Sequence, residues 1–428
     1  MMRWFYSLVF YLSLPLVVVR LLWRARSAPA YARRWGERFG FFAARPGNRP
    51  AIWLHAVSVG ETLAALPLIK QLQLRYPQHD LIVTTTTPTG SERVKAAFGE
   101  TVFHVYAPYD LPDCLGRFLR RARPQLAVIM ETELWPNTIA ACHKRQIPVV
   151  IANARLSEKS ARGYGRFAAL ATPMLQQVSM VAAQAQADGQ RFVNLGVPSD
   201  KLSVTGNIKF DLTLDATVRA QAQAIRQRWQ GTGQASNSAR PILLAASTHQ
   251  GEDALLLQAF ATLLPEHPSL LLVLVPRHPE RFERVAAEAS RNYRLQKHSE
   301  GGAVAADTQV VVGDTMGELL ALLGASDLVF MGGTWVPNGG HNLIEPAAWA
   351  KPVFCGPSLF NFAEVSRLLK EAGGLQVVET PADLALAVAQ ALSSPERSER
   401  MGQAAQQVAD ANRGALERLL GVIDHQLM

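Results

Sequence analysis

The stretch Met331-Gly-Gly-Thr-Trp-Val-Pro-Asn-Gly-Gly-His-Asn-Leu-Ile-Glu-Pro346 gives the strongest indication of both a fold and a kind of site. It follows an apolar, strand-like run at 327–330 and opens a helix-like run at 343–350. Four glycines let backbone approach a ligand closely, and N–H groups at a helix start suit a phosphate. Glu345 could accept hydrogen bonds from two ribose hydroxyls. The pattern indicates a nucleotide-sugar site, with an ordinary glycine-rich loop as the alternative.

From residue 51 the chain alternates short apolar runs with helix-period segments, which is typical of parallel sheets with helical crossovers. The sequence therefore predicts an α/β protein with two doubly wound halves, and ligands beyond the carboxyl ends of the strands, in a cleft between the halves. The strand candidates are 52–57, 81–86, 126–130, 149–152 and 204–209, then 242–246, 270–275, 310–312, 328–330 and 352–354.

A length of 428 residues allows two domains that each bury a core. Residues 226–240 are polar and contain Gly, Ser and Asn, which favours an interdomain linker. We expect a membrane anchor at 1–26, a first domain at 27–225 and a second at 241–428. The last helix could cross back to the first domain.

The formal net charge of +8 is confined to the N-terminal region. Residues 1–50 hold nine of the 43 basic residues and one of the 35 acidic residues, which leaves 34 of each elsewhere. We therefore expect no nucleic-acid partner.

Residues 4–19 are mainly apolar, which is short of the about 20 residues that a membrane span needs, although 21–23 extend the run. A span and an interfacial helix both stay open. Most of the arginines follow this segment, so the positive-inside rule places the later residues in the cytoplasm. They would also favour anionic lipid headgroups. No small-residue cleavage site follows, which argues against a removed signal peptide.

Polar residues follow several strand candidates in the first half. Glu61 falls in the first turn of a predicted helix, where it is a candidate general base or simply a capping carboxylate. Ser58 and Gly60 lie in the turn before it. Glu131 and Glu133 come directly after an apolar run, and Glu133 has an equally plausible structural role in a salt bridge. Lys209 could pair with Glu131 and stabilise a departing phosphate.

The second half repeats this arrangement after its own strand candidates. Ser247, Thr248 and His249 could meet phosphate or sugar, and Arg277 after Pro276 offers planar donors for a phosphate or a base edge. Backbone N–H groups at Met316 and Gly317, and the close approach that Gly333 permits, complete the candidate donor site.

No cluster of histidines and cysteines has zinc-ligand spacing, so we expect no metal. Cys114, Cys142 and Cys355 lack a paired spacing and are expected to be small core residues rather than disulfide partners.

Six motifs in a fixed order resemble the 3-deoxy-D-manno-octulosonic acid (Kdo) transferases of Gram-negative lipid A assembly. They are HAVSVGE at 55–61, METELWPN at 130–137, GNIKFD at 206–211, VPRHPER at 275–281, GDTMGEL at 313–319 and GGHNLIEP at 339–346. The resemblance covers essentially the whole chain. It implies a GT-B fold of two Rossmann-like domains, an inverting transfer from CMP-Kdo to lipid IVA, no cofactor or bound metal, and a location on the cytoplasmic side of the inner membrane.

The resemblance also implies roles for individual residues. Glu61 matches the family's catalytic base, while Glu131 and Lys209 match its transition-state-stabilising positions. The residues that match its CMP contacts are Pro276, Arg277, Met316, Gly317, Glu318, Leu319, Asn342, Leu343, Ile344 and Glu345. It assigns no role to Trp335 or His341.

Two other functions stay open on the residues alone. A UDP-sugar epimerase of GT-B-like fold would share the nucleotide site but would not need the N-terminal anchor. A non-catalytic, membrane-bound nucleotide-sugar binder would not need Glu61. The sequence does not indicate how many Kdo residues would be added.

Overall fold

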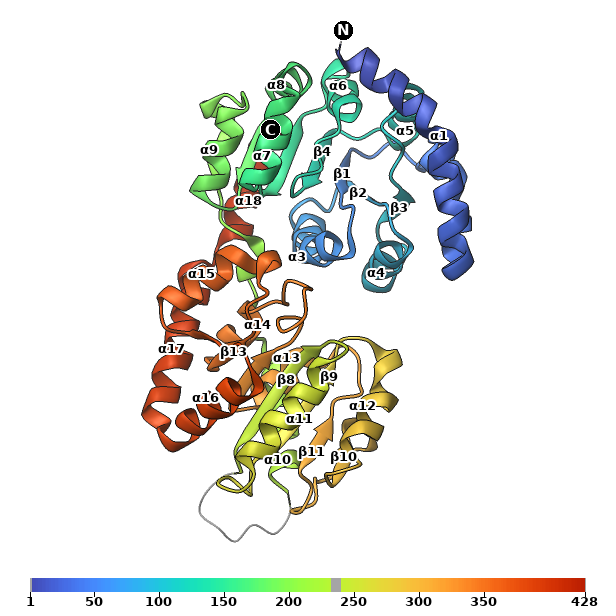
Figure 1. Ribbon diagram of the computed structural model, residues 1–428. Coiled ribbons are helices and arrows are strands. Elements are labelled where there is room, and N and C mark those ends of the chain that lie inside the picture. Colours follow the sequence, from blue (N-terminus) through green and yellow to red (C-terminus); the bar gives the residue numbers. More distant parts are fainter. Residues whose placement is uncertain (1, 232–239, 428) are drawn as a thin grey trace. The chain divides into compact units, whose positions relative to one another are not determined.

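The chain forms two compact units in a computed structural model that describes residues 2–231 and 240–427 (Figure 1). Unit 1 contains the chain up to Asp211 and from Arg413 onward, and unit 2 contains Leu212–Asn412. Each unit holds one seven-stranded sheet flanked by helices. The prediction of two doubly wound α/β halves is confirmed.

The sheet of unit 1 has the strand order β3-β2-β1-β4-β5-β6-β7, with parallel neighbours throughout. The chain moves outward from β1 to β3 and then returns to β4 on the other side of β1. Ligands in such sheets bind at this reversal, beyond the carboxyl ends of the strands. The strands are β1 Ala51–His55, β2 Asp80–Thr85, β3 Phe103–Tyr106, β4 Leu126–Met130, β5 Val149–Ala154, β6 Met180–Ala183 and β7 Leu202–Val204.

Helices cover both faces of this sheet, and several begin at the turn chemistry that a helix start requires. Ser58 and Thr87 each accept a hydrogen bond from a backbone N–H in the first turn of the following helix. The helices are α1 Met2–Ser27, α2 Trp35–Arg38, α3 Val59–Arg75, α4 Pro88–Phe98, α5 Pro112–Ala122, α6 Pro136–Lys144, α7 Glu158–Arg166, α8 Ala168–Gln176, α9 Gln186–Asn194 and α18 Ala415–Leu427.

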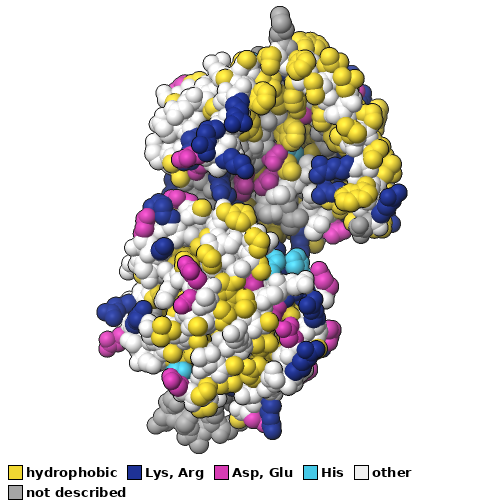
Figure 2. Space-filling view, viewed as in Figure 1, with side chains coloured by type: hydrophobic (Ala, Val, Ile, Leu, Met, Phe, Trp, Pro, Cys, Tyr) yellow, Lys and Arg dark blue, Asp and Glu magenta, His cyan; other side chains and the backbone are white. Residues whose placement is uncertain are grey.

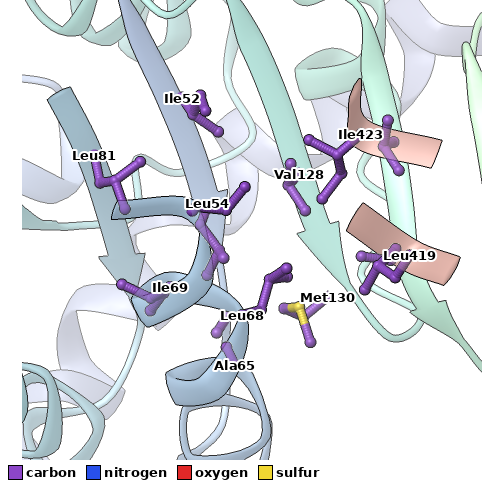
Figure 3. Close-up of a cluster of buried hydrophobic side chains, with 14 of the residues drawn as sticks. Ile52, Leu54, Ala65, Leu68, Ile69, Leu81, Val128, Met130, Leu419 and Ile423 are labelled. Carbon is purple, nitrogen blue, oxygen red and sulfur yellow. The ribbon is translucent and has the colours of Figure 1, made fainter. Parts of the chain in front are cut away.

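The C-terminal helix α18 completes the core of unit 1, although it follows unit 2 in the sequence. Leu419 and Ile423 point toward Val128 and Met130 of β4 in Figure 3, beside Leu68 of α3. All five side chains are fully buried. The last helix therefore crosses back to the first domain.

The sheet of unit 2 has the order β10-β11-β9-β8-β12-β13-β14, again with parallel neighbours, and reverses between β8 and β12. Its strands are β8 Ile242–Thr248, β9 Leu271–Pro276, β10 Leu295–Lys297, β11 Val310–Val312, β12 Leu328–Met331, β13 Val353–Cys355 and β14 Leu375–Val377. Its helices are α10 Ala216–Gln230, α11 Glu252–Leu263, α12 Phe282–Ala289, α13 Leu319–Ala325, α14 Ile344–Ala348, α15 Ala363–Glu371, α16 Pro381–Ser393 and α17 Pro395–Ala411.

The predicted linker at 226–240 is wrong in its placement. Its first five residues belong to α10, in which Trp229 is buried and Arg226 forms a 2.8 Å ion pair with Asp327. Residues 232–239 lie outside the described residues. The boundary between the units falls instead between Asp211 and Leu212, so the first domain ends earlier than residue 225.

The strand predicted at 204–209 is also wrong beyond its first residue. The strand β7 ends at Val204, and residues 208–210 form a single 3-10 turn. Asn207 caps this turn by accepting a hydrogen bond from the backbone N–H of Lys209. Capping by asparagine favours such a turn over an extended strand.

The N-terminal apolar segment forms α1, which is the helix in residues 2–231 and 240–427 that is long and apolar enough to cross a membrane. Hydrophobic side chains gather over it in Figure 2. Its outward face exposes a stripe of apolar side chains, namely Trp4, Leu8, Leu12, Leu16, Val19 and Trp23. Hydrogen bonds join the first half of α1 to two other helices of unit 1. Ser7 bonds to Asn137 of α6, and Tyr11 bonds to Asp113 of α5.

Candidate active site

The candidate base Glu61 lies at the start of α3, just beyond the carboxyl end of β1. The carboxylate accepts hydrogen bonds from the backbone N–H of Val57 at 2.8 Å and from the hydroxyl of Ser58 at 2.8 Å. In return, the Glu61 N–H donates to the Ser58 hydroxyl at 3.1 Å. This reciprocal arrangement is close to a capping box, so the carboxylate is held in one orientation.

The pKa of Glu61 is shifted by its surroundings. Burial raises the pKa above its ordinary value of 4.5, while the hydrogen bonds from Val57 and Ser58 lower it and the charge of Glu131 raises it further. Glu133 has a larger shift, because burial and the charges of Glu61 and Glu131 raise its pKa to about 7. These shifts show that the three carboxylates are electrostatically coupled at one edge of the sheet.

Glu131 and Lys209 form the ion pair that the sequence suggested, with 3.2 Å between Lys209 Nζ and Glu131 Oε1. Glu131 adopts a left-handed backbone conformation with φ of 54° immediately after β4. Residues other than glycine rarely adopt this backbone conformation, and it is found often at functional sites. Asn153 fixes the backbone next to Lys209, because its Oδ1 accepts a hydrogen bond at 3.1 Å from the backbone N–H of Ile208.

An apolar pocket of about 580 Å³ lies in unit 1, and its lining includes residues 132–136 that follow β4. Glu133 is its acidic member, and Trp135 of its wall donates a 2.9 Å hydrogen bond to that carboxylate. The first two turns of α1 form one side of the pocket. Its apolar lining comprises Met2, Phe5, Tyr6, Val9, Leu134, Trp135, Pro136, Tyr164, Phe167, Leu170, Ala171 and Met174.

In unit 2, the strands β11, β9, β8 and β12 are consecutive neighbours in the sheet. Their carboxyl ends therefore bring four segments to one edge, namely residues 313–319, 276–277, 247–249 and 331–346. Arg277 is fixed there by a 3.0 Å hydrogen bond from its backbone N–H to the Thr248 carbonyl. Burial lowers the pKa of His341 to about 3, and the charge of Arg277 adds to this effect.

Asn342 lies in the turn before α14, and Glu345 lies in the first turn of that helix. Asn342 Nδ2 donates to Glu345 Oε1 at 3.2 Å, and Asn342 Oδ1 accepts from the backbone N–H of Ile344 at 3.2 Å. Burial raises the pKa of Glu345, against the opposing effects of Asn342 and Arg277.

Two family models match the chain, one for each unit. The model described as 3-deoxy-D-manno-octulosonic-acid transferase (kdotransferase) matches residues 33–212, and that for glycosyl transferases group 1 matches residues 246–408. The 3-deoxy-D-manno-octulosonic acid transferase of Haemophilus influenzae is 44% identical to this chain, over 99% of the chain and 98% of its own length. The chain belongs to the Kdo transferase family. A second relative, from Bordetella pertussis, is 34% identical over 95% of this chain and 96% of its own.

This membership confirms the resemblance carried by the six motifs, and the chain is an enzyme of the glycosyltransferase class. It favours that class over the epimerase and binder alternatives. A UDP-GlcNAc 2-epimerase from Neisseria meningitidis has a TM-score of 0.59 at 15% identity, covering 87% of this chain and 99% of its own. A glycosyltransferase from Rickettsia africae has a TM-score of 0.57 at 15% identity, covering 89% and 99%. At such identity the likeness shows the GT-B fold alone.

Within this Kdo transferase fold, some sequence-predicted residues are engaged by the protein itself. The Thr248 hydroxyl is fully buried and donates to Asp253 Oδ1 at 2.6 Å, so it serves the packing of unit 2. Ser247 is also buried and has a left-handed φ of 55°. In the turn at 316–319 the side chain of Met316 is exposed. Gly317 has a positive φ of 89°, which glycine adopts without strain in a tight turn before α13.

Sequence reasoning missed Glu252. This carboxylate is fully buried and contacts the loop that follows β12, about eighty residues further along the chain. At the first turn of a predicted helix it is indistinguishable from an ordinary capping residue. The sequence therefore offered no signal that would single out this acid.

Among the described residues, no three His, Cys, Asp or Glu side chains gather as a metal ion would require. The expectation that the reaction needs no metal stays a prediction. The three cysteines are buried and form no disulfide.

Proposed function

We propose that this enzyme transfers Kdo from CMP-Kdo to lipid IVA, a lipid A precursor, with inversion at the anomeric carbon and without a bound metal or cofactor. Family membership supports the sugar and the reaction class. The observation that carries the proposal is the oriented, buried Glu61 carboxylate beside the Glu131–Lys209 ion pair.

Glu61 takes the proton from the acceptor hydroxyl in this proposal. The hydroxyl oxygen forms a bond to the anomeric carbon, and the bond from that carbon to the phosphate oxygen breaks. CMP leaves with the electron pair. The raised pKa of Glu61 makes it a stronger base than an exposed carboxylate, which suits proton abstraction near neutral pH.

Positive charge and fixed hydrogen-bond groups would receive the donor. Arg277 provides planar donors for the phosphate or the base, and Glu345 accepts hydrogen bonds from ribose hydroxyls. Lys209, oriented by Glu131, stabilises charge that develops as the phosphate departs. Pro276, the 316–319 turn and the 342–345 turn complete the proposed CMP contacts.

A lipid acceptor is supported by the apolar pocket beside Glu133. A purely water-soluble sugar acceptor would have no use for about 580 Å³ of pocket with a mainly apolar lining. Glu133 lines the pocket and follows the same strand end as Glu131, so we propose that an acceptor sugar bound at Glu61 extends an acyl chain into this pocket.

We propose further that α1 lies in the plane of the membrane surface rather than across it. Hydrogen bonds tie Ser7 and Tyr11 to unit 1, so the first half of the helix has the domain on one side. Its exposed apolar stripe would enter the lipid, and the following arginines would meet anionic headgroups. In this proposal the enzyme acts on the cytoplasmic side of the inner membrane, as the resemblance to the Kdo transferases implies.

The decisive assay mixes the full-length protein with CMP-Kdo generated in situ and lipid IVA, and resolves the product by mass. Product heavier by whole Kdo residues supports the proposal, and the mass counts the residues added. A de-acylated acceptor should react poorly, and EDTA should leave the rate unchanged. Folded, CMP-binding protein that yields no product from both substrates would refute the proposal.

A further inference from the structure

The carboxylate of Glu252 collects four backbone N–H groups. Its Oε1 accepts from Thr334 at 3.0 Å and Trp335 at 2.9 Å, while its Oε2 accepts from Gly333 at 2.7 Å and His249 at 2.8 Å. The side chain is fully buried. These four donors satisfy both oxygens of the buried carboxylate and hold the side chain in one orientation.

Three of these donors are consecutive, at residues 333–335. Successive N–H groups that converge in a turn form a concave nest for an anion, which is how many phosphate sites are built. Here a carboxylate of the chain itself occupies that nest. The N–H groups of Gly333, Thr334 and Trp335 therefore hold Glu252, whereas the Gly332 N–H donates to the Ala246 carbonyl at 2.8 Å.

Glu252 also joins the two sides of the sheet reversal in unit 2. It lies at the start of α11, after β8, whereas the nest follows β12, and these two strands are neighbours. The backbones approach so closely that a Cβ at Gly332 would lie 2.7 Å from the Ser247 carbonyl oxygen. Ligands bind at such a reversal, so Glu252 fixes the floor of the candidate donor site.

The segments that Glu252 joins carry His249 and His341. Their Nε2 atoms lie 2.8 Å apart and their rings stack at 5.1 Å. One ring must donate the proton that the other accepts. A Cβ at Gly333 would lie 3.1 Å from the His341 ring, so the nest also sets the position of that ring.

We propose that Glu252 is a positioning residue that replaces a phosphate in the glycine nest, and thereby holds His249, His341 and the Arg277 segment in place for the donor. The donor phosphate then binds elsewhere on this edge, at Arg277 and the 339–345 turn. The part concerning the donor rests on the proposed function, whereas the filling of the nest does not.

Hydrogen exchange of the wild-type protein tests the nest without any substitution. The amides of residues 249 and 333–335 should be protected before CMP is added, and CMP should change their exchange less than about twofold. Amides that exchange freely in the unliganded protein and become protected only with CMP would overturn the proposal, because the nest would then belong to the ligand.

Substitution tests the positioning role. In Glu252→Gln one acceptor oxygen remains, but the amide nitrogen faces two N–H donors. We expect faster local exchange at 333–335 and at least about tenfold weaker CMP binding by calorimetry, whereas exchange in unit 1 should be unchanged. The matched control is Glu283→Gln in α12, whose exposed carboxylate contacts Lys297.

Two results separate the inference from the proposed function. Unchanged CMP affinity and unchanged exchange in Glu252→Gln would overturn the positioning role, even if the wild type transfers Kdo. If the wild type transfers no Kdo but its amides at 249 and 333–335 are protected, Glu252 still fills the nest, and only the part that concerns the CMP-Kdo donor is rejected. If Glu252→Gln does not fold, wild-type exchange still decides the occupancy of the nest.

Discussion

The carboxylate of Glu61 both caps the start of α3 and is the candidate base. The hydrogen bonds with Ser58 and Val57 that cap α3 are the same bonds that orient the acid, so the two readings of this residue are compatible. Its distinction from other capping acids comes from burial and from the neighbouring Glu131 and Glu133. Those neighbours follow the strand β4, whereas Glu61 follows β1, and sequence spacing alone does not report that these two strand ends are adjacent.

Glu133 gives a testable pH dependence. Its pKa is raised from 4.5 to about 7 in the folded protein, so the folded state binds a proton more tightly than the unfolded state. The free energy of unfolding should therefore fall as pH rises between about 4.5 and 7, by at most about 3 kcal/mol before solvent screening. Glu133→Gln should remove this slope and raise stability at pH 8, as measured by urea unfolding. An unchanged slope would contradict the assignment.

At the scale of elements, the central strands were predictable because they are apolar along their whole length. The strands β1, β4, β8 and β12 are buried on both faces, and their runs are evident in the sequence. The strands β3, β6, β10 and β14 were missed. All four are only three or four residues long, and in β10 the segment Leu295-Gln-Lys297 is half-buried and partly polar. The last five residues of α10, 226–230, were predicted as linker because their one buried side chain, Trp229, is surrounded by polar residues.

The membrane role of α1 makes a prediction about two exposed leucines. Leu12 and Leu16 are 73% and 72% exposed, on the face that we propose enters lipid. The double substitution Leu12→Glu, Leu16→Glu should reduce sedimentation with anionic vesicles by at least about tenfold, through loss of apolar burial and charge repulsion. CMP affinity should not change.

Leu74→Glu is the matched control, since Leu74 is 73% exposed on α3. Its vesicle binding should equal that of the wild type. Full vesicle binding by the double variant would contradict the proposed orientation of α1.

At the scale of the whole molecule, the chain passes from unit 1 through unit 2 and returns with α18. The return was foreseeable, but the core contacts of α18 were not, because they pair residues near 420 with strands near 128. Likewise, the six motifs lie at the carboxyl ends of strands in both sheets, as the sequence predicts, whereas Glu252 contacts backbone groups that have no sequence signature.

The returning helix should stabilise unit 1 selectively. Leu419→Ala removes a fully buried side chain from the core that α18 shares with α3 and β4, at a cost of about 2–5 kcal/mol. Hydrogen exchange should accelerate in β1, β4 and α3, while the strands of unit 2 keep their protection. Equal acceleration in both units would contradict this account.

The most direct test of the account compares Kdo transfer by the wild type, Glu61→Gln and the exposed control Glu92→Gln, with CMP affinity measured for each. Loss of the base should lower the transfer rate by at least about 10²-fold while CMP binding stays within about twofold, and Glu92→Gln should match the wild type. Transfer by Glu61→Gln at the wild-type rate would remove Glu61 as the base and contradict the central claim.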